Sequence, residues 1–389
     1  MSVVNLGTFP PKQCGIATFS MDLKKSLELN KQNVKIIAVS DNSYKYNYGN
    51  EVIFNINQEE KADYRQAALL VNTSPDLELV IIQHEYGIFG GESGEYILEF
   101  TRLLNKPYIL ITHTVLPKPQ PKQLKILQNL GTKASGIVCM TQKSAEFLNR
   151  LYHIPKNKIR VIGHGVPPFK KEDSQVLKAK YNLTGYEIIS TFGLIGPGKG
   201  LELGIKAMAE VVREYPDTKY LILGQTHPML KKVEGENYRE MLENLIVQLN
   251  LENKVQFVNK FLSDEELGEY LYLTDIYLSP YPNKDQAVSG TLTFAIGCGR
   301  AIVSTSYTYA VEVLKNNRGL LAAEADPGEI ATLIKKILGD GKLKETLQQN
   351  AYALGKNWIW PNIGREYTSF INNILKKEKR EAKINYAGL

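Results

Sequence analysis

The chain contains 389 residues, of which 43% are hydrophobic, and it carries a formal net charge of +6 at pH 7. A single hydrophobic core seldom grows beyond about 250–300 residues, so this length predicts two domains. Lysine and arginine residues are spread over the whole sequence without a basic run interleaved with aromatic residues. This distribution argues against a nucleic-acid-binding protein and predicts only a general attraction to anions.

The cysteines and the apolar segments indicate the cellular compartment in which we expect the protein. Cys14, Cys139 and Cys298 lie far apart and two of them sit in apolar runs, which favours reduced thiols in the cytoplasm over a disulfide or a metal site. The N-terminal residues lack the pattern of a signal peptide, and no apolar run approaches the roughly 18 residues of a membrane span. We therefore expect a soluble protein, with peripheral contact to a membrane surface left open. The oligomeric state is not predicted.

Short β-rich runs alternate with helical patterns along the chain. In the first half, strands are predicted at 2–6, 34–39, 79–83, 108–112, 136–140 and 159–163, and helices at 18–29, 64–72, 95–104, 121–130 and 143–152. In the second half, strands are predicted at 187–192, 219–223, 255–259, 276–279, 301–304 and 319–322, and helices at 201–214, 238–249, 264–273, 289–296, 310–315, 327–338 and 342–350. This alternation predicts an α/β fold with two Rossmann-like, doubly wound domains that face each other across a cleft.

The polar, proline-containing stretch 165–173 shows no periodicity and marks the predicted domain boundary. We expect an N-terminal domain at 1–168 and a C-terminal domain at 169–355; the acceptor-binding and donor-binding roles of these domains follow only from the family resemblance described below. Aromatic and aliphatic residues at helical spacing follow, and 356–389 is predicted to be a helix that returns across the domain junction.

Ser289, Gly290 and Thr291 open one of the predicted helices, directly after a loop with two prolines. A first turn of this composition presents unpaired backbone N–H groups and two hydroxyls at the positive end of the helix dipole, and its glycine lets a ligand come close. Such a turn is typical of a phosphate-binding site. An ordinary capped helix packed on a sheet would show the same residues, because Ser and Thr are common N-caps.

A glycine-rich turn, GLIGPGKG at 193–200, follows a predicted strand and leads into a helix. Gly193 and Gly198 permit a sharp turn with exposed amides, and Lys199 supplies a positive charge. The turn is neither a P-loop nor the dinucleotide fingerprint, since a glycine follows the lysine and the glycine spacing differs. A purely structural turn is the alternative, but the Ser-Gly-Thr helix of the same predicted domain favours phosphate binding. The turn after the first strand places Gly15 where a sugar or phosphate could approach the backbone.

Polar side chains at the ends of predicted strands point to a sugar-binding site. The candidates for contact with sugar hydroxyls are His84, Glu85, Glu92, His113 and His164. His227, in the second predicted domain, is a candidate donor to a phosphate or a base. A metal site is not predicted, because the sequence has neither an HExxH motif nor Cys/His ligand spacing.

On these residues the sequence resembles a retaining glycosyltransferase of family four, the group 1 family, which has the GT-B fold. Gly15 matches the first-domain glycine loop, and the turn at 193–200 matches the turn that holds the donor pyrophosphate. His113 matches the cleft histidine near the transferred sugar, and His164 with the Gly-Val after it corresponds to the family's Asn-Gly-Val at the interdomain junction. Trp358 resembles the tryptophan that starts the returning C-terminal helix.

Two positions depart from the family pattern. Leu194 stands where the family has the arginine of its basic pair, which leaves Lys199 as the one cation of the pair. In the motif of Glu, seven residues and Glu, Gln286 takes the first position with Asp285 beside it, and Phe294 takes the second. The resemblance implies that Gln286 or Asp285 contacts the donor sugar, whereas Phe294 cannot accept the ribose hydrogen bonds of the usual glutamate.

The resemblance implies a retaining hexosyltransferase, with mannose or glucose as the sugar, that uses an activated donor such as a nucleotide sugar and a carbohydrate or other hydroxyl acceptor, without a metal or another cofactor. Its catalytic candidates are His113, Lys199, Gln286 and Asp285. Two alternatives stay open. A GT-B glycoside phosphorylase would bind phosphate or a sugar 1-phosphate and would need neither the second glutamate nor the arginine. A non-catalytic carbohydrate-binding member of the family would have lost the motif altogether.

Overall fold

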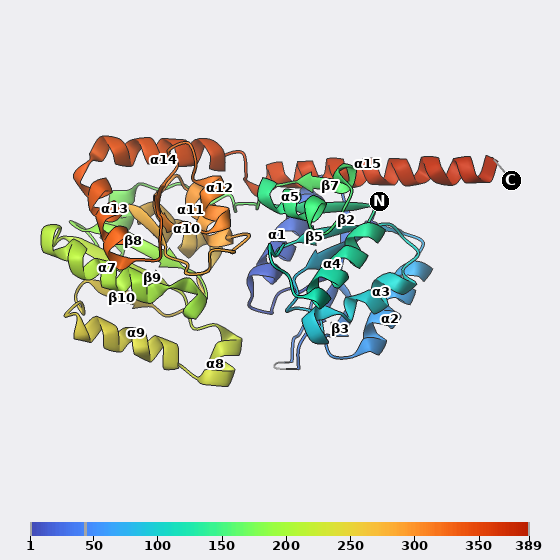
Figure 1. The fold of residues 1–389 in the computed structure, drawn as a ribbon, viewed down its shortest axis with the longest axis horizontal. Coiled ribbons are helices and arrows are strands. Elements are labelled where there is room, and N and C mark those ends of the chain that lie inside the picture. Colours follow the sequence, from blue (N-terminus) through green and yellow to red (C-terminus); the bar gives the residue numbers. More distant parts are fainter. Residues whose placement is uncertain (1, 43–44, 388–389) are drawn as a thin grey trace. The chain divides into compact units, whose positions relative to one another are not determined.

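The computed structural model describes residues 2–42 and 45–387 of the chain, with side chains as far as residue 381. The chain divides into two compact units (Figure 1). The first unit comprises Met1–Gly165 together with Trp360–Leu389, and the second comprises Val166–Ile359. Each unit has its own parallel sheet and its own core, as the alternating strand and helix patterns predict.

The first unit is built around a seven-stranded parallel sheet with the order β3-β2-β1-β4-β5-β6-β7. The strands are β1 (Ser2–Gly7), β2 (Asn33–Ser40), β3 (Val52–Asn57), β4 (Leu77–His84), β5 (Tyr108–Thr112), β6 (Gly136–Cys139) and β7 (Ile159–Val161). The helices are α1 (Gly15–Leu29), α2 (Lys61–Thr73), α3 (Ile97–Leu103), α4 (Pro121–Lys133), α5 (Gln142–Arg150) and α15 (Trp360–Ala387), with short 3₁₀ turns at Glu92–Gly94 and Lys156–Lys158. The central strands are buried on both faces, which explains why they read as continuous apolar runs.

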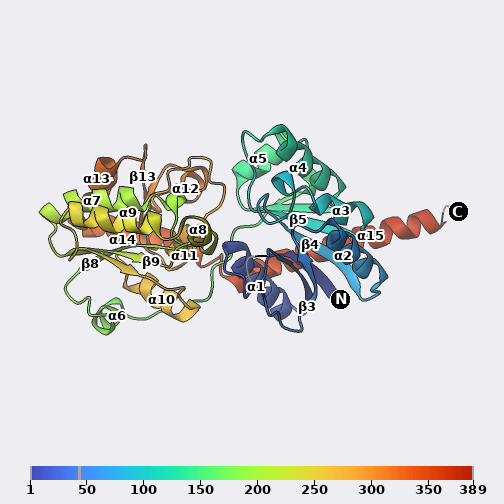
Figure 2. The ribbon, with the colours of Figure 1, turned by 90° about the horizontal axis from the view of Figure 1, so that it is seen from below.

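The helix α15 belongs to the first unit, where it lies along α1 (Figure 2). Ser26 of α1 donates a hydrogen bond to the backbone carbonyl of Trp360, and a Cβ at Gly364 would lie 2.0 Å from the Ser26 hydroxyl oxygen. The glycine therefore lets the two helices approach closely. The last segment of the chain thus contributes to the core of the first unit.

The second unit contains a six-stranded parallel sheet with the order β10-β9-β8-β11-β12-β13. Its strands are β8 (Glu187–Phe192), β9 (Thr218–Leu223), β10 (Val255–Val258), β11 (Ile276–Ser279), β12 (Ala301–Thr305) and β13 (Leu320–Ala322). Its helices are α6 (Ser174–Lys180), α7 (Leu201–Glu214), α8 (Pro228–Glu234), α9 (Asn237–Gln248), α10 (Asp264–Leu273), α11 (Gly290–Gly297), α12 (Thr308–Val313), α13 (Pro327–Gly339) and α14 (Gly341–Gly355), with a 3₁₀ turn at Pro197–Lys199.

Two separate apolar clusters cover the two faces of this sheet. Ile188 and Tyr277 belong to one cluster, and their neighbours Ile189 and Ile276 belong to the other. Because successive side chains of a strand point to opposite faces, this division shows helices packed on both sides of the sheet. The predicted α/β, doubly wound architecture is therefore confirmed for each unit.

The structure places the boundary between the units a few residues away from the boundary predicted from the sequence. The units meet at Gly165 and Val166, not at residues 168 and 169, and the chain re-enters the first unit at Trp360, not at residue 356. Val166 and Ile359 form a parallel bridge, and the Val166 N–H donates to the carbonyl of Trp358 at 2.8 Å. Trp358 therefore lies in the second unit, and the C-terminal helix starts two residues later.

Three elements were not predicted. The strand β3 lies at the edge of its sheet, and most of its residues are only partly buried, although its sequence VIFNIN is largely apolar. The helices α6 and α8 have seven residues each. The side chain of Asp173 caps α6 by accepting the N–H groups of Gln175 and Val176, so the predicted linker ends in a helix N-cap.

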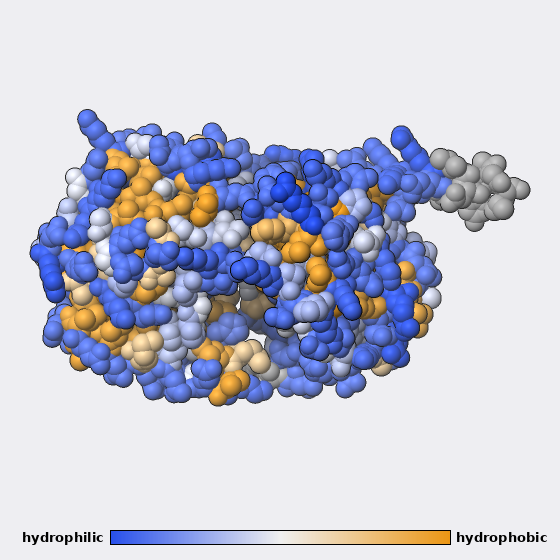
Figure 3. All heavy atoms as spheres, in the orientation of Figure 1, coloured by the Kyte–Doolittle hydropathy of each residue, from blue (hydrophilic) through white to orange (hydrophobic). Residues whose placement is uncertain are grey.

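The face of the molecule in Figure 3 is mostly hydrophilic, with hydrophobic atoms gathered in patches, one of them over α8. This short helix leaves Val233 77% and Met229 41% exposed. Within the described residues, no helix combines the length and the apolar character needed to cross a bilayer.

Candidate functional site

The predicted phosphate-binding turn forms the start of α11. Ser289 is the N-cap, and its hydroxyl accepts the N–H of Leu292 at 3.2 Å. The hydroxyls of Ser289 and Thr291 lie 3.1 Å apart, and Ser289 itself is buried. The rest of α11 is apolar and buried, which fixes the helix against the sheet. Its first turn therefore presents two hydroxyls and unpaired N–H groups on a rigid support.

The glycine-rich turn brings Lys199 to this helix start. Gly193 has a φ of +127°, and a Cβ at this position would lie 3.3 Å from both the Lys199 Nζ and the Thr291 Cγ2. Gly200 has a φ of +60°, and a Cβ there would lie 2.1 Å from the carbonyl oxygen of Pro280. Both positions thus need glycine for backbone conformation and for close approach. The structure brings together Gly193, Lys199 and Thr291, as predicted.

Tyr281 joins this group, and the sequence did not indicate it. The Lys199 Nζ donates to the Tyr281 hydroxyl at 2.7 Å, and that hydroxyl lies 2.7 Å from the Thr291 Oγ1. The Tyr281 ring is buried and stacks on Tyr307 with a centroid distance of 5.1 Å. A chain of hydrogen bonds therefore runs from the lysine through the phenol to the hydroxyls of α11.

The electrostatics of this group follow from one cation among neutral hydroxyls. Burial opposes ionisation of Tyr281, but the charge of Lys199 and the hydrogen bonds from Lys199, Thr291 and Ser289 bring its pKa below the usual value. Among the residues that the structure describes, no carboxylate is paired with Lys199. The positive charge is therefore available to an anion.

The other residues predicted to bind the donor are His227, Gly198 and Gly290. His227 is the N-cap of α8, its backbone N–H donates to Ile195 at 2.9 Å, and burial followed by the charge of Lys199 lowers its pKa. Gly198 lies in the 3₁₀ turn before α7 with open space beside it. Gly290 is the first residue of α11. His227 and the two glycines therefore surround the same turn.

The two residues of the altered motif do not converge on Lys199. The Gln286 side-chain amide donates to the carbonyl of Val288 at 2.7 Å, within its own loop. Asp285 is exposed, and its backbone N–H donates to the Asn283 Oδ1 at 3.0 Å. Their predicted contact with the donor sugar stays a prediction.

Phe294 is the clearest departure from a polar donor site. Its ring is buried, stacks on Phe192 at 5.9 Å and meets Phe169 edge-on at 5.6 Å. These three rings contain no hydrogen-bond acceptor, so the buried position of Phe294 lacks the carboxylate that the resemblance leads one to expect there.

In the first unit, His113 follows β5 and bonds to a buried amide. Its Nε2 lies 2.8 Å from the Gln83 Oε1, and the Gln83 Nε2 donates to the Asn5 Oδ1 at 2.7 Å. Phe19 of α1 packs edge-on against His113 and His164, with centroid distances of 4.9 and 5.2 Å. The structure therefore brings two of the predicted histidines to one aromatic ring.

The three predicted histidines of the first unit share a pKa shift that favours the neutral form. Burial lowers the pKa of His84 to about 4 and that of His164 to about 4. Burial, reinforced by the neighbouring His164 and His84, lowers the pKa of His113 to about 3. Above about pH 5 these rings act as neutral hydrogen-bonding groups and not as cations.

Two of the predicted acidic residues differ in their surroundings. The Glu85 carboxylate accepts hydrogen bonds from the Thr114 hydroxyl and from the Tyr86 N–H, and burial raises its pKa. Glu92 instead lies exposed in a 3₁₀ turn, where it pairs with Lys122 at 2.8 Å. Glu85 directly follows His84 in the sequence. In the described part of the chain, no hydrogen bond or ion pair joins Glu92 to the predicted histidines.

Gly15 is the first residue of α1, and a Cβ there would meet no atom within 4 Å. The open space agrees with the predicted approach of a ligand. Cys14 caps this helix by accepting the N–H of Ala17 on its sulfur. All three cysteines are free thiols.

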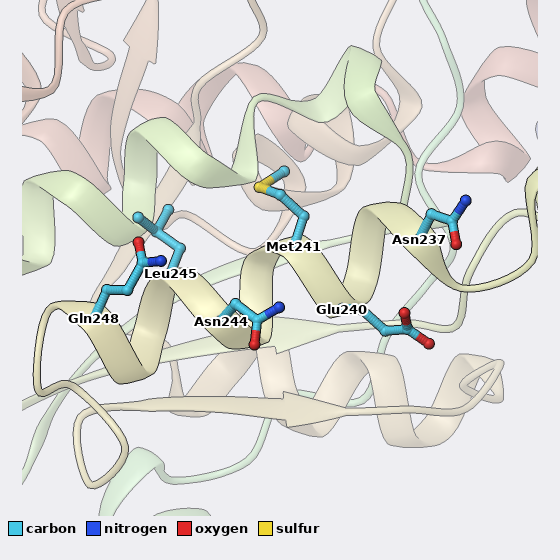
Figure 4. A pocket seen from close by; sticks show the side chains of 6 residues that line it. All are labelled: Asn237, Glu240, Met241, Asn244, Leu245 and Gln248. Carbon is cyan, nitrogen blue, oxygen red and sulfur yellow. The ribbon is translucent and has the colours of Figure 1, made fainter.

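Other concave or charged regions do not offer a stronger site. A groove on the second unit is lined by side chains of α9 alone, and Figure 4 shows them along one helix. The lining residues are Asn237, Glu240, Met241, Asn244, Leu245 and Gln248. Within the described part of the chain, no three His, Cys, Asp or Glu side chains are grouped as metal ligands.

Two protein-family models match the chain. The model for Glycosyltransferase Family 4 matches residues 14–168, and the model for Glycosyl transferases group 1 matches residues 173–354. An uncharacterized glycosyltransferase of Methanocaldococcus jannaschii is 22% identical over 92% of this chain and 95% of its own length. D-inositol 3-phosphate glycosyltransferase of Jonesia denitrificans is 23% identical over 69% of this chain and 63% of its own length.

Solved structures share the fold over nearly the whole chain. The Anabaena protein HepE in complex with UDP superposes with a TM-score of 0.77 at 16% identity, covering 96% of this chain and all of HepE. Sucrose-phosphate synthase from Thermosynechococcus elongatus superposes with a TM-score of 0.78 at 16% identity, covering 97% of this chain and 100% of that one. At this identity the likeness establishes the fold.

Proposed function

The chain carries both domains of the group 1 glycosyltransferases in a GT-B fold, and we propose that it is a retaining hexosyltransferase with a nucleotide-sugar donor and a carbohydrate or other hydroxyl acceptor. The observation that carries the proposal is the meeting of Lys199, Gly193 and Thr291 at the start of α11. Glucose and mannose are the sugars we favour. HepE was solved in complex with UDP, which supports a nucleotide donor for this chain by analogy.

In this proposal the donor phosphate binds to the N–H groups and hydroxyls at the start of α11, with the charge of Lys199 on one side. As the bond between the sugar and the phosphate breaks, negative charge grows on the leaving phosphate oxygen. Groups that are already oriented toward that position stabilise the charge without reorganisation. Gly193 and Gly198 give the phosphate access to the backbone, and His227 contributes a neutral ring beside Lys199.

Retention of configuration follows from attack on the face that the phosphate leaves. The acceptor oxygen forms the new bond to the anomeric carbon, the old bond to the phosphate oxygen breaks, and the acceptor proton passes to that phosphate oxygen. This route needs no carboxylate nucleophile, in agreement with Gln286 at the position of the first glutamate. Lys199 and the α11 dipole supply the positive charge, so the proposal requires no metal or other cofactor.

The first unit supplies the groups for sugar hydroxyls. His113 is partly exposed beside Gln83. His84 is buried at the end of β4, Glu85 comes directly after it, and His164 is buried shortly after β7 of the same sheet. Neutral imidazoles and a hydrogen-bonded carboxyl group suit hydroxyl recognition. Three free thiols favour the cytoplasm as the compartment of the reaction.

A second candidate function rests on Phe294. Its packing between Phe192 and Phe169 leaves no acceptor for a ribose hydroxyl on that side of α11. A glycoside phosphorylase, which binds phosphate or a sugar 1-phosphate, would need no such acceptor. The same phosphate-binding turn would then serve a smaller anion.

Thermal unfolding with UDP, GDP, ADP, inorganic phosphate and several sugar 1-phosphates separates these functions. A ligand at 100 times its dissociation constant adds about 2.7 kcal/mol to the free energy of unfolding. Stabilisation by one nucleoside diphosphate and not by phosphate supports the transferase and identifies the base. Stabilisation by phosphate or sugar 1-phosphates alone supports the phosphorylase.

Replacement of Lys199 by Ala tests the site itself. We expect turnover to fall by two orders of magnitude or more, because removal of one preorganised charge contact typically costs about 10²–10³ in rate. The matched control is Lys206→Ala, which removes an exposed lysine from α7. Equal rates for the two variants would refute the phosphate site.

A further inference from the structure

A line of hydrogen bonds crosses three neighbouring strands of the first unit and ends at His113. Asn5 lies on β1, Gln83 on β4, and His113 directly after β5. The order of the sheet makes these strands adjacent. Asn5 and Gln83 are fully buried, whereas His113 is partly exposed. The line therefore connects the interior of the sheet to the one ring that a ligand can reach.

The direction of the bonds determines the tautomer of His113. The Gln83 amide nitrogen donates to the Asn5 Oδ1 at 2.7 Å, which leaves the Gln83 carbonyl oxygen pointing at the His113 Nε2 at 2.8 Å. A carbonyl oxygen can only accept, so the His113 Nε2 must carry the proton. The neutral ring then has an unprotonated Nδ1.

Gln83 is held firmly enough to impose this choice. Its side chain has no exposed surface, and a Cβ on Gly7 would lie 2.7 Å from the Gln83 Cβ. The glycine on β1 thus leaves room for the glutamine, and any larger residue would displace it. Phe19 packs edge-on against the imidazole and limits the rotation of the ring.

The charges around His113 favour the neutral ring. The titratable groups that act on it are the buried rings of His84, at the end of β4, and His164, after β7. The Glu85 carboxylate is hydrogen-bonded to Thr114, the residue next to His113. A proton on any one of these three rings would disfavour a proton on the other two. Gln83, its hydrogen-bonding partner, is uncharged and gives the imidazolium no counter-ion. His113 therefore differs from the histidines of catalytic triads, which are paired with a carboxylate.

We propose that Gln83 is a positioning residue that holds His113 as the Nε2–H tautomer and presents the Nδ1 as a hydrogen-bond acceptor to a sugar hydroxyl. The identity of this ligand rests on the proposed function, but the tautomer does not. His113 then selects a hydroxyl that can donate to it. Asn5 supports Gln83 from behind and has no contact with the ligand.

Nitrogen-15 NMR of the full chain, with ¹⁵N-labelled histidine, tests the tautomer without any substrate. The chain has five histidines, and a His113→Asn variant identifies the relevant signals by their loss. We expect the His113 Nε2 to show the shift of a protonated nitrogen and the Nδ1 that of an unprotonated one at pH 7. The reverse pattern would mean that the side-chain amides of Asn5 and Gln83 both have oxygen and nitrogen exchanged. That result would overturn the proposal.

Kinetics of two Gln83 variants test the positioning role. Gln83→Glu places a carboxylate against the Nε2, which stabilises the imidazolium and raises the pKa of His113. The Asn5 Nδ2, buried without a partner, can then donate to the new carboxylate. We expect kcat of this variant to fall at low pH with a new ionisation between about pH 5 and 8, because the protonated ring loses its acceptor.

Gln83→Met is the matched variant without a charge. It should lower kcat about tenfold, as expected for one lost orienting hydrogen bond, and should show no new ionisation. The same flat pH profile in both variants would show that Gln83 only fills space and would overturn the positioning role. If His113→Asn leaves turnover unchanged, the sugar contact of the proposed function is wrong, and the NMR result still decides the tautomer.

Discussion

The neutral histidines of the first unit predict a specific dependence of stability on pH. The pKa of His84, His113 and His164 is lowered by burial in the folded state. The unfolded chain therefore binds more protons than the folded one at pH values between the two pKa values. The contribution of the neutral histidines to the stability of the first unit should be complete above about pH 6.5, the ordinary histidine pKa. This contribution should be lost as the pH falls toward about 4.

The size of the effect follows from the shift at each histidine. For His84, a pKa of 6.5 in the unfolded chain and about 4 in the folded one makes the unit about 2 kcal/mol less stable at pH 5 than at pH 7. His113 and His164 contribute similar amounts, so the three together set an upper limit of about 6 kcal/mol. That is a large part of the 5–15 kcal/mol by which folded domains are usually stable.

The two tryptophans allow the first unit to be observed alone. Trp360 is buried in the first unit, 5.0 Å from the Phe19 ring, whereas Trp358 belongs to the second unit. In a Trp358→Phe background, urea unfolding followed by fluorescence therefore reports on Trp360. We expect the midpoint to fall between pH 7 and pH 5, and His84→Asn to remove about 2 kcal/mol of that loss.

The comparison of the two proteins isolates His84, because they share every other titrating group. His153→Asn is the control, since His153 is exposed and has a φ of +57°, which asparagine tolerates. If the Trp358→Phe protein and its His84→Asn derivative lose the same stability between pH 7 and pH 5, the neutral, buried state of His84 is wrong.

Three further substitutions test the second unit. Tyr281→Phe removes the hydroxyl that holds Lys199, so phosphate or diphosphate should bind about tenfold more weakly in calorimetry, and adding this change to Lys199→Ala should cost nothing more. Phe294→Glu places a carboxylate among aromatic rings and should lower the free energy of unfolding in urea by at least about 3 kcal/mol; a stable variant that binds a nucleoside diphosphate more tightly would contradict this. Gly224→Ala would place a Cβ 2.1 Å from a backbone carbonyl at a φ of +137°, and should destabilise far more than Gly185→Ala, which has a φ of +85° but open space.

Most of the fold could be predicted because parallel strands buried on both faces are continuous apolar runs. The predicted strands 108–112, 187–192 and 276–279 coincide with β5, β8 and β11. The edge strand β3 was not predicted, although its sequence VIFNIN is largely apolar. The predicted boundary between the units is displaced by a few residues, because the Val166 bridge to Ile359 joins segments that are far apart in the sequence.

The geometry of the proposed phosphate-binding turn was predictable for a similar local reason. Gly193, Lys199 and the Ser-Gly-Thr helix start each carry their signal within a few residues. Tyr281 carries no such signal, because its role depends on a lysine 82 residues earlier and on stacking against Tyr307. Gln83 was hidden in the same way, since its partner His113 lies 30 residues later on another strand. Residues that act by positioning another side chain become visible only in the structure.

In the proposed donor site, the two departures from the family pattern have opposite consequences. At the phosphate end, Leu194 removes a cation, but Tyr281 and Thr291 fix the remaining Lys199 against the helix start. At the ribose end, Phe294 is stacked on aromatic rings, and no hydrogen-bond acceptor replaces the lost carboxylate within that stack. If this donor site is the one used, we expect its binding energy to come mainly from the phosphate and the sugar. If a nucleotide donor is used, its affinity should depend on the diphosphate far more than on the ribose hydroxyls, and a 2′,3′-dideoxy nucleoside diphosphate should bind within a fewfold of the parent.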